Sequence, residues 1–488
     1  MQRSIKVSDR KYILLIIDLA IILMTTLFSL WIHANGLESL TFGFPYLVDQ
    51  VGWLILLSGL WISAAYMNGL YDPIACTNPV KALFALTSSG AIVMIAYLLV
   101  FFYVAPTQIL PRGIVVYQVI SGFVLISLWR IGYLYLSRSP RFQRKIIILG
   151  AGWAGKTIAR VILENAASQY QIVGFVDDDP PVEDSGIPIY SSDEGMSAGD
   201  GQPEREMLDR IPVLGPCVDL PSIVAGRNIP EVVLAITHDM SGDTFRSLLD
   251  LKELSVEITL MTELYEHLTG MVPIEHIGDN WFVSLPMDLA ETSLFYAFAS
   301  RLFDIFSAGL GLILLLPLFP LIALAIRLDS PGPIIYSQER VGKGGKRFLI
   351  YKLRTMVQEA EEGGRALRAE KDDPRITRVG RILRKIRIDE MPQLWNILKG
   401  DMSAVGPRPE RPEHLSIMEE KIPFHRLRNA VKPGMAGWAV VNYGYVDDLS
   451  SASIRLQYDL YYVKHQSIFL DIIILLRTFG QVVLMKGR

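Results

Sequence analysis

The sequence predicts an α/β membrane protein in three parts: an apolar helical region, a small α/β domain and a mainly helical, basic domain. Four apolar stretches, each long enough to cross a bilayer core of about 30 Å as a helix, lie within the first 140 of 488 residues. After them, short strand-like runs alternate with helical segments, which is typical of a parallel sheet covered by helices. The predicted boundaries are 1–140, 141–296 and 297–488.

The composition supports a membrane protein and excludes some kinds of site. Apolar residues make up 51% of the chain and the mean hydropathy is +0.32, both high for a soluble protein. Residues 1–300 contain 18 Lys and Arg against 30 Asp and Glu, whereas residues 301–488 contain 29 against 20. The last third is therefore expected to meet phosphates or lipid headgroups, with a solvated basic face as the alternative. The two cysteines and seven scattered histidines form no metal-binding motif.

The four apolar stretches are expected to be transmembrane helices. They cover Tyr12–Ile32, Tyr46–Met67, Ala82–Val104 and Ile114–Leu136. Basic residues precede the first and follow the fourth, and the loop at 33–50 has no Lys or Arg, so the positive-inside rule places both ends in the cytoplasm. Asp18 and Arg130 lie within the stretches, either as functional groups or as an interhelical polar contact.

A glycine pattern marks the start of the α/β domain. The strand pattern at 145–150 leads into Gly150-x-Gly152-x-x-Gly155 and a helix, and Asp177 ends the next strand pattern. This arrangement can hold a dinucleotide or a nucleotide sugar, so Gly150, Gly152, Gly155 and Asp177 are candidate nucleotide-binding residues. A regulatory or a purely structural domain are the alternatives. A polar, acidic segment, Glu183–Arg210, is interpreted as a mobile insertion. Further strand patterns follow at Ile211–Gly215, Glu231–Ile236 and Glu257–Met261.

The apolar run Ile305–Ile326 is long enough to cross the membrane, but Pro317 and Pro320 interrupt it. Charged residues flank both ends, beginning with Arg301, so the charge rule places both ends in the cytoplasm. Because proline removes a backbone donor and bends a helix, we expect a re-entrant hairpin, with a proline-kinked fifth transmembrane helix as the alternative. The segment Leu460–Leu484 contains three charged residues and is expected to be an interfacial helix.

Cations, glycines and a pair of carboxylates concentrate in the basic third. Asp389 follows a basic helix pattern and precedes a helix start marked by Pro392. Helix amides, Arg384 and Arg387 are therefore expected to hold the Asp389 carboxylate ionised. Such a carboxylate can attack phosphorus, while Glu390 can share a divalent metal such as Mg²⁺ or transfer protons. From spacing alone, the alternative is that Asp389 is an N-cap and Glu390 a favourable first-turn charge.

Residues 301–488 resemble the bacterial sugar transferases, the polyprenyl-phosphate hexose-1-phosphate transferases. The resemblance rests on Arg301-Leu-Phe-Asp304, the proline-broken run and the blocks Tyr351–Met356, Ile388–Asn396, Leu398–Ser403, Gly406–Pro409 and Lys432–Trp438. It implies a re-entrant membrane helix and a catalytic, Mg²⁺-binding pair at Asp389 and Glu390. It also implies phosphate contacts from Arg384 and Arg408. Cations of the neighbouring motif blocks complete the candidate phosphate-binding set: Arg340, Lys352 and Lys432.

The first 300 residues resemble the long branch of this family, which adds four transmembrane helices and a Rossmann-like domain. This implies transfer of glucose-1-phosphate or galactose-1-phosphate from a UDP-sugar to undecaprenyl phosphate, with release of UMP. The expected location is the bacterial inner membrane, with the catalytic domain on the cytoplasmic face. The reaction would begin exopolysaccharide, capsule or O-antigen synthesis. Expected partners are the two substrates, the bilayer and a second copy in a homo-oligomer, with no nucleic acid.

Two other classes of protein compete with this interpretation. Membrane-bound nucleotide-sugar dehydratases share a similar N-terminal layout but need a Tyr-x-x-x-Lys pair, which does not occur between Asp177 and Ser300. A non-catalytic scaffold or regulator of polysaccharide assembly would carry an inactive transferase domain. The intact pair Asp389-Glu390 argues against that second class.

Overall fold

The computed structural model divides the chain into two units, Met1–Trp281 and Phe282–Arg488, which are described separately. The predicted insertion Glu183–Arg210 lies outside the described residues, apart from Leu208 and Arg210. The structure describes residues 7–35, 43–71, 79–103, 112–137, 143–167, 169–178, 208, 210–236, 240–274, 294–357, 373–422, 424–444 and 449–483.

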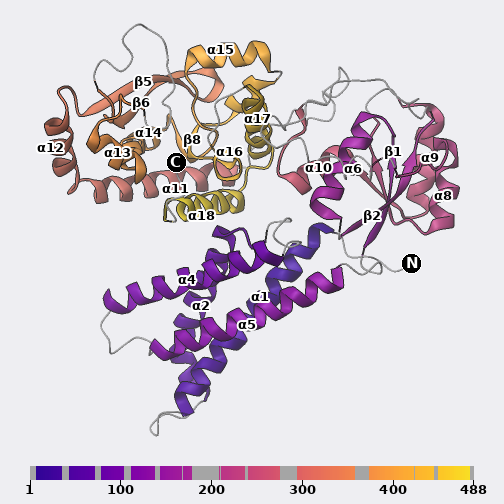
Figure 1. Ribbon diagram of the computed structural model, residues 1–488, viewed down its shortest axis with the longest axis horizontal. Helices are drawn as coiled ribbons and strands as arrows, with labels where there is room; N and C mark the ends of the chain where they lie inside the picture. Colours follow the sequence, from indigo (N-terminus) through magenta and orange to yellow (C-terminus); the bar gives the residue numbers. More distant parts are fainter. Residues whose placement is uncertain are drawn as a thin grey trace. The chain divides into compact units, whose positions relative to one another are not determined.

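The first unit contains a bundle of four long helices (Figure 1). They are α1 (Val7–Asn35), α2 (Phe44–Met67), α4 (Pro79–Tyr103) and α5 (Arg112–Ser137). Stretches of α1, α2 and α5 are long and apolar enough to cross a membrane, and the apolar part of α4 found among the described residues is the shorter Ala82–Leu98. All four predicted apolar helices are therefore present as helices.

A buried ion pair joins α1 to α5. Arg130 donates to Asp18 at 2.5 Å, and both side chains are almost completely buried. The Arg130 guanidinium also lies over the ring of Tyr71, 5.3 Å from its centroid. The pair confirms the interhelical polar contact that was one interpretation of these two charges. Each charge compensates the other, because either one alone would be costly to bury.

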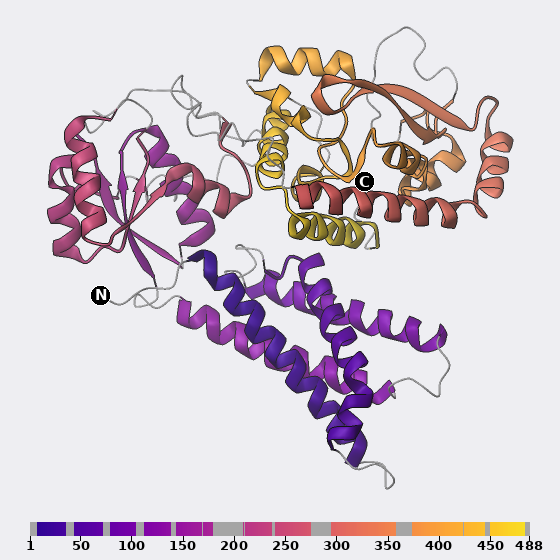
Figure 2. The same cartoon turned by 180° about the vertical axis from the view of Figure 1, so that it is seen from behind.

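The α/β domain contains a four-stranded parallel sheet in the order β2-β1-β3-β4, which confirms the predicted parallel sheet. The strands are β1 (Arg144–Leu149), β2 (Tyr170–Val176), β3 (Glu231–Leu234) and β4 (Glu257–Leu260). One face is covered by α6 (Trp153–Ala166) and α10 (Met261–Thr269), and the other by α8 (Leu220–Arg227) and α9 (Gly242–Glu253), as Figures 1 and 2 show. The predicted strand at Ile211–Gly215 is reduced to a single parallel bridge between Val213 and Phe175 of β2 and does not form a full strand.

Alternation along β1 explains this two-faced packing. Ile146 and Ile148 pack with α6 and α10, whereas Ile147 and Leu149 pack with α8 and α9. Successive side chains of a strand point to opposite faces, so a continuous apolar run suits a strand buried on both sides.

The second unit opens with a broken helix, as the two prolines predicted. α11 (Leu294–Leu315) ends in a turn at 316–318, and α12 (Phe319–Asp329) leaves it in a clearly different direction (Figure 1). Pro317 lies in this turn. Pro320 lies in the first turn of α12, where a missing N–H group costs nothing. The helix begins before Ile305, the predicted start of the apolar run.

The rest of this unit is mainly helical around two small sheets. β5 (Ile335–Val341) and β6 (Arg347–Leu353) form an antiparallel hairpin, and β7 (Ser403–Val405) pairs in parallel with β8 (Gly434–Ala436). The helices and turns are η5 (Lys343–Gly345), α13 (Arg378–Lys385), η6 (Ile388–Glu390), α14 (Gln393–Lys399), α15 (Pro412–Lys421), η7 (His425–Ala430), α16 (Trp438–Asn442), α17 (Leu449–Lys464) and α18 (Ile468–Val483).

The predicted single helix over Leu460–Leu484 is wrong, because the end of α17 and all of α18 share this segment. The Ser467 hydroxyl accepts a hydrogen bond from the Leu470 amide at 3.2 Å, which starts a new helix there. α18 then lies alongside α11 in both views (Figures 1 and 2). A core of Ala308, Leu394 and their apolar neighbours joins α11 to α14 and β6, and thereby fixes the segment just before α14.

Candidate active site

Asp389 and Glu390 lie in the short turn η6 between α13 and α14. Thr377 begins α13, since its hydroxyl accepts a hydrogen bond from the Gly380 amide at 3.0 Å. Between α13 and η6, Arg387 has a φ of 56°, a left-handed conformation that non-glycine residues rarely adopt. The two carboxylates therefore follow a strained turn, which is a common feature of functional sites.

The Glu390 carboxylate is buried within a cluster of cations. Its Oε1 accepts a hydrogen bond from Lys352 Nζ at 2.8 Å, and an Arg408 nitrogen lies 3.4 Å from the same oxygen. Burial alone would raise the pKa of Glu390, but Lys352 and Arg408 hold that pKa well below its usual range. Glu390 is therefore ionised at neutral pH.

Asp389 has a different electrostatic environment from its neighbour. Burial raises the pKa of Asp389 to about 6, the charge of Glu390 adds to this effect, and Lys352, Arg384 and Arg408 oppose it. Its carboxylate makes no hydrogen bond to any other residue that the structure describes. Arg384 and Arg387 were expected to hold Asp389 ionised. The direct cation contacts are instead those of Lys352 and Arg408 with Glu390, and it is the pKa of Glu390 that they lower.

The N-cap interpretation of Asp389 is wrong. Helix α14 begins at Gln393 with Pro392 in the N-cap position, and no side chain makes a capping hydrogen bond there. Asp389 is thus three residues away from the position at which a carboxylate would cap this helix.

Arg384 is positioned from the end of β6. Its Nε donates a hydrogen bond to the Thr355 hydroxyl at 2.9 Å, and its charge acts on Asp389. Thr355 is nearly buried, at 6% exposure. The strand end carries Lys352 three residues earlier, so one short segment positions two of the cations around the carboxylates.

Arg408 belongs to the loop Gly406–Glu410, which is tied down at several points. The Gly406 amide donates to Ala436 at 2.8 Å, and the Gly434 amide donates to Pro407 at 2.9 Å. A Cβ atom on Gly406 would overlap the carbonyl oxygen of Lys432, which explains a glycine in this motif. The loop therefore presents Arg408 to Glu390 from a fixed backbone.

A buried ion cluster lies beneath this loop. The Arg428 guanidinium donates to the carbonyl oxygen of Arg408 at 3.0 Å and pairs with Asp459 at 2.7 Å. It also lies 3.3 Å from Glu410, to which Arg455 is a second, longer partner at 3.7 Å. Burial would raise the pKa of Glu410, but Arg428 and Arg455 lower it to about 2.

Two members of the predicted phosphate-binding set, Arg340 and Lys432, have other partners than the carboxylate pair. Arg340 donates to the Gln338 side chain at 2.8 Å and to the Pro409 carbonyl at 3.4 Å; burial, then Arg408, lower its pKa to about 10. Burial lowers the pKa of Lys432; the largest charge effects on it come from Arg301 and Asp304, not from Asp389 or Glu390. The structure thus brings Lys352, Arg384 and Arg408 to the carboxylates. Arg340 contacts the Arg408 loop instead, and Lys432 is influenced by Arg301 and Asp304 of α11.

Two residues of α11 fasten the broken helix to the site. Arg301 donates to the carbonyl oxygens of Ile397 and Leu398, each at 2.7 Å, at the C-terminal end of α14. Asp304, one helical turn later, accepts from the Ala404 amide at 2.7 Å and from the Ser403 hydroxyl at 3.0 Å. α14 and β7 are therefore fixed to α11.

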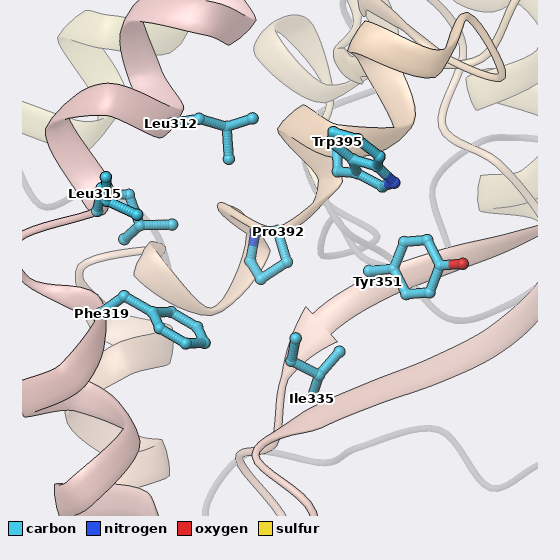
Figure 3. A pocket seen from close by; sticks show the side chains of 8 residues that line it. Leu312, Leu315, Phe319, Ile335, Tyr351, Pro392 and Trp395 are labelled. Atoms are coloured by element: carbon cyan, nitrogen blue, oxygen red, sulfur yellow. The ribbon is translucent and has the colours of Figure 1, made fainter.

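An apolar pocket of about 480 Å³ is lined by residues of α11, α12, β5, β6 and the start of α14 (Figure 3). Tyr351 and Trp395 face it from β6 and α14, and Phe319 faces it from α12. The remaining lining residues are Leu312, Leu315, Leu316, Ile335 and Pro392.

The candidate nucleotide-binding residues lie together at the end of β1 in the other unit. Gly150 has a φ of +108°, and a Cβ atom on Gly155 would overlap the carbonyl oxygen of Gly150, so both positions need glycine. Gly152 is the N-cap of α6 and has open space around it. Asp177 Oδ2 accepts a hydrogen bond from the Ala151 amide at 2.6 Å. The Ala151 amide of the glycine loop is thus already bonded to the carboxylate of Asp177.

Sequence reasoning missed Thr355, Arg428 and Asp459. Thr355 stands inside a recognised block, but nothing local shows that its hydroxyl binds Arg384. Arg428 and Asp459 are 31 residues apart and meet only through the tertiary fold. Arg301 and Asp304 belong to a motif that the sequence shows. The groups that they bind on α14 and β7 could not be predicted from it.

Comparison with known proteins places these residues in a family. The family model "Bacterial sugar transferase" matches residues 295–485, and "CoA-binding domain" matches residues 66–262.

Three curated relatives are similar to the chain. A "UDP-N-acetylgalactosamine-undecaprenyl-phosphate N-acetylgalactosaminephosphotransferase" of Aeromonas hydrophila is 40% identical over 261 residues, covering 54% of this chain and 60% of the relative. A "UDP-glucose:undecaprenyl-phosphate glucose-1-phosphate transferase" of Xanthomonas campestris pv. campestris is 32% identical over 275 residues, covering 56% and 57%. A "Putative undecaprenyl-phosphate N-acetylgalactosaminyl 1-phosphate transferase" of Bacillus subtilis is 44% identical over 171 residues, covering 35% and 84%.

The matches to the first two relatives span somewhat less than two thirds of their length, whereas the match to the third takes in most of it. The family model covers the segment that contains the carboxylate pair, its cations and the broken helix. The chain therefore belongs to the bacterial sugar transferase family.

Proposed function

We propose that the protein transfers a hexose-1-phosphate from a UDP-sugar to undecaprenyl phosphate and releases UMP, as the first membrane step of polysaccharide synthesis. One observation carries this proposal: Lys352, Arg384 and Arg408 converge on two adjacent carboxylates with different pKa values. Cations suited to a diphosphate surround a carboxylate that can act as a nucleophile. The names of the relatives describe the same class of reaction.

Asp389 is the proposed nucleophile. With a pKa of about 6 it is mostly ionised at neutral pH, and it has no hydrogen bond to a described residue that would restrain its attack. One carboxylate oxygen bonds to the phosphorus that carries the sugar, and the bond from that phosphorus to the bridging oxygen breaks, so that UMP leaves. The phosphate of the lipid carrier then attacks the same phosphorus, which releases the Asp389 carboxylate and forms the polyprenyl-diphosphate sugar.

Lys352 and Arg408 serve both Glu390 and the substrate in this scheme. Their charges stabilise the negative charge that develops around phosphorus during both displacements. Glu390 stays ionised through its low pKa, which suits a positioning or metal-binding group better than one that exchanges protons near neutral pH.

Mg²⁺ fits the carboxylate pair. Within the described part of the chain no group of three or more His, Cys, Asp or Glu side chains gathers, but Mg²⁺ commonly binds through one or two carboxylates together with substrate phosphates. Repulsion from Glu390 contributes to the raised pKa of Asp389, and a divalent cation between them would relieve it. Asp389 and Glu390 would hold the ion, which would neutralise charge on the diphosphate.

The membrane arrangement is part of the same proposal. We propose that α1, α2, α4 and α5 cross the bacterial inner membrane, with both ends of the bundle in the cytoplasm. α11 and α12 would form a re-entrant hairpin that leaves the catalytic residues on the cytoplasmic face, where UDP-sugars are supplied. The break at 316–318 and the large exposed side chains of α11, such as Phe306 and Ile313, support this arrangement.

We propose a structural or regulatory role for the Rossmann-like domain. Its glycine loop has the required backbone, but Asp177 is bonded to the Ala151 amide, so a phosphate would have to displace a carboxylate and face its negative charge. The oligomeric state stays a prediction.

The decisive test is UMP release by the full-length protein in membranes or detergent, with Mg²⁺, undecaprenyl phosphate and a panel of UDP-glucose, UDP-galactose and UDP-N-acetylgalactosamine. We expect release with at least one of these sugars and a sugar-bearing lipid product. The Asp389→Asn protein should be inactive at unchanged expression, because an amide is a poor nucleophile. Near-normal turnover by Asp389→Asn would exclude the nucleophile assignment, and a chain inactive with every sugar would favour the scaffold alternative.

A further inference from the structure

We infer that the apolar pocket between α11, α12 and α14 holds the isoprene units nearest the phosphate of the lipid carrier. This inference rests on the proposed transfer to a polyprenyl phosphate, and it adds where the tail of that substrate lies and which side chains select it.

The pocket has the size and lining of a site for a hydrocarbon chain. Its volume of about 480 Å³ is within the roughly 300–1,000 Å³ typical of small-ligand sites. All eight lining residues are apolar or aromatic, and their polar side-chain groups are the Tyr351 hydroxyl and the Trp395 indole N–H. Figure 3 shows the rings of Trp395 and Tyr351 on one side and Leu312, Leu315 and Phe319 on the other, with Pro392 between them.

Three of the eight lining side chains are exposed, those of Leu316, Ile335 and Trp395, whereas Leu315 and Pro392 are buried. Leu316 is 72% exposed and Trp395 is 56% exposed, although the fold buries other residues of α14, such as Ile397. Contiguous exposed apolar surface beside polar groups is typical of a binding site, because water is a poor partner for it.

Two chain segments carry both pocket residues and residues of the cation cluster. In β6, Tyr351 lines the pocket, and the next residue, Lys352, extends from the opposite face of the strand and donates to Glu390. After η6, Pro392 lines the pocket two residues beyond Glu390. A ligand that fills both regions must be anionic at one end and apolar along the rest.

This chemistry identifies the occupant among the molecules that the reaction involves. A UDP-sugar has an anionic centre but no apolar chain, so even a stacked uracil ring would leave most of the apolar lining without a partner. A polyprenyl phosphate has both parts, and its phosphate monoester carries more negative charge for the cations than the phosphodiester of an ordinary phospholipid. The branched, unsaturated isoprene units also suit a wide pocket lined by aromatic rings.

The test compares pocket variants of the full-length protein in detergent micelles. Trp395→Ala and Leu316→Ala remove pocket surface, and Trp395→Phe restores an aromatic ring. Leu318→Ala is the matched control, because Leu318 is 49% exposed in the same turn but does not line the pocket. Three quantities are measured: the KM for undecaprenyl phosphate, the KM for the UDP-sugar, and UMP release before any acceptor is added.

We expect Trp395→Ala and Leu316→Ala to raise the KM for undecaprenyl phosphate about tenfold, equivalent to about 1.4 kcal/mol. The KM for the UDP-sugar and the acceptor-free UMP release should stay at the wild-type level, and Trp395→Phe should recover most of the loss. With farnesyl phosphate, whose tail is shorter, the effect should persist, because the proximal units bind in the pocket. Leu318→Ala should match the wild type in every assay.

An unchanged carrier KM in both pocket variants would overturn the inference. Reduced acceptor-free UMP release would overturn it as well, because the pocket would then support the donor half of the reaction or the fold. If binding to liposomes without carrier falls in parallel with activity, the pocket belongs to bulk lipid instead. A wild-type protein that releases no UMP would contradict the proposed function itself, an outcome visible before any variant is compared.

Discussion

Lys352 donates a 2.8 Å hydrogen bond to the Oε1 atom of Glu390, so that the end of strand β6 and the turn η6 meet in a buried ion pair at the carboxylate centre. Both side chains are mostly buried, with exposures of 20% and 11%. A pair in such a place is weak evidence for stability, but breaking it leaves a charge without its partner. The pair therefore sets the electrostatics on which Asp389 depends.

This relationship predicts a coupled effect on catalysis. Lys352→Met and Glu390→Gln should each lower kcat by roughly 100-fold or more, because both change the charge around the reacting phosphorus. The double variant should lose less than the product of the two single losses, with a coupling energy of about 1–3 kcal/mol. UMP release is measured for all three proteins, with Lys346→Met as an exposed cation control from the same hairpin. Strict additivity would show that the two residues act independently.

The buried cluster beneath the Arg408 loop predicts a separation of stability from activity. Arg428→Met leaves Asp459 buried without its closest cation and should destabilise the fold by about 3–5 kcal/mol. The double variant Arg428→Met/Asp459→Leu replaces the pair by apolar groups and should regain part of the melting temperature, because Glu410 still loses Arg428 and keeps only Arg455. Its kcat should stay low, because the donor to the Arg408 carbonyl is still missing.

Arg426→Met is the control for this pair of experiments, since Arg426 makes an exposed ion pair with Glu419. It should change neither the melting temperature nor the rate appreciably. Full recovery of activity in the double variant would mean that Arg428 acts only through the stability of the fold.

His425 predicts a pH dependence of stability. Burial, together with the charge of Arg428, lowers the pKa of His425 from 6.5 to about 4. The unfolded chain therefore binds a proton near pH 6.5 that the folded chain binds only near 4, so stability falls as the pH decreases through this window, by at most about 3 kcal/mol. Glu410, with its pKa lowered to about 2, adds a further loss below pH 4.5.

His425→Gln should make the melting temperature less dependent on pH between 6.5 and 4.5, measured by thermal unfolding of the full-length protein in detergent. His465→Gln, in the turn that follows α17, serves as the control histidine. A wild-type melting temperature that does not fall below pH 6.5 would contradict the assignment to His425.

Local patterns in the sequence predicted many of the elements, and tertiary contacts account for what they missed. Pro317 and Pro320 predicted the break between α11 and α12, because proline acts on its own helix. The alternation of strands and helices predicted the parallel sheet for the same local reason. Val213 does not continue a strand, because it has only one bridge partner on β2. The number of bridge partners that a residue finds depends on the tertiary fold, so the local sequence pattern could not predict it.

The site divides in the same way. Asp389, Glu390 and the cations around them stand in blocks that can be recognised in the sequence, so their proximity was predictable. Which carboxylate the cations contact was not predictable, since Lys352 approaches Glu390 from a strand 38 residues away. Cations were expected to hold Asp389 ionised, whereas burial and the charge of Glu390 raise its pKa to about 6. The interaction between Arg428 and the Arg408 loop likewise depends on the path of the chain through η7 and α17.

The membrane hairpin predicts that both ends of the broken helix face the cytoplasm. Single cysteines at Leu294 and Leu328, which are 90% and 79% exposed at the outer ends of α11 and α12, should both react only when a membrane-impermeant reagent reaches the cytoplasmic side. A cysteine at Phe306, in the middle of α11, should be protected by lipid. Labelling of position 328 from outside would favour a fifth crossing.

The last prediction concerns the division of labour between the two units. The second unit has its own apolar cores, and every candidate catalytic and phosphate-binding residue lies within it. The family model starts at residue 295, and a match of 171 residues makes up 84% of the Bacillus subtilis relative, so a short chain can represent the family. A protein that begins near Ser293 should therefore retain measurable transfer of hexose-1-phosphate, although its stability in detergent should be lower without the helical bundle.

UMP release and the lipid product are measured after size-exclusion chromatography has shown that the shortened protein is monodisperse. The same shortened chain with Asp389→Asn is the matched control, and it should release no UMP above background. Activity that depends on Asp389 within this fragment would locate the chemistry entirely in the second unit. A fragment that is well folded and completely inactive would show that the first 292 residues contribute directly to the site, because the loss could not then be attributed to unfolding.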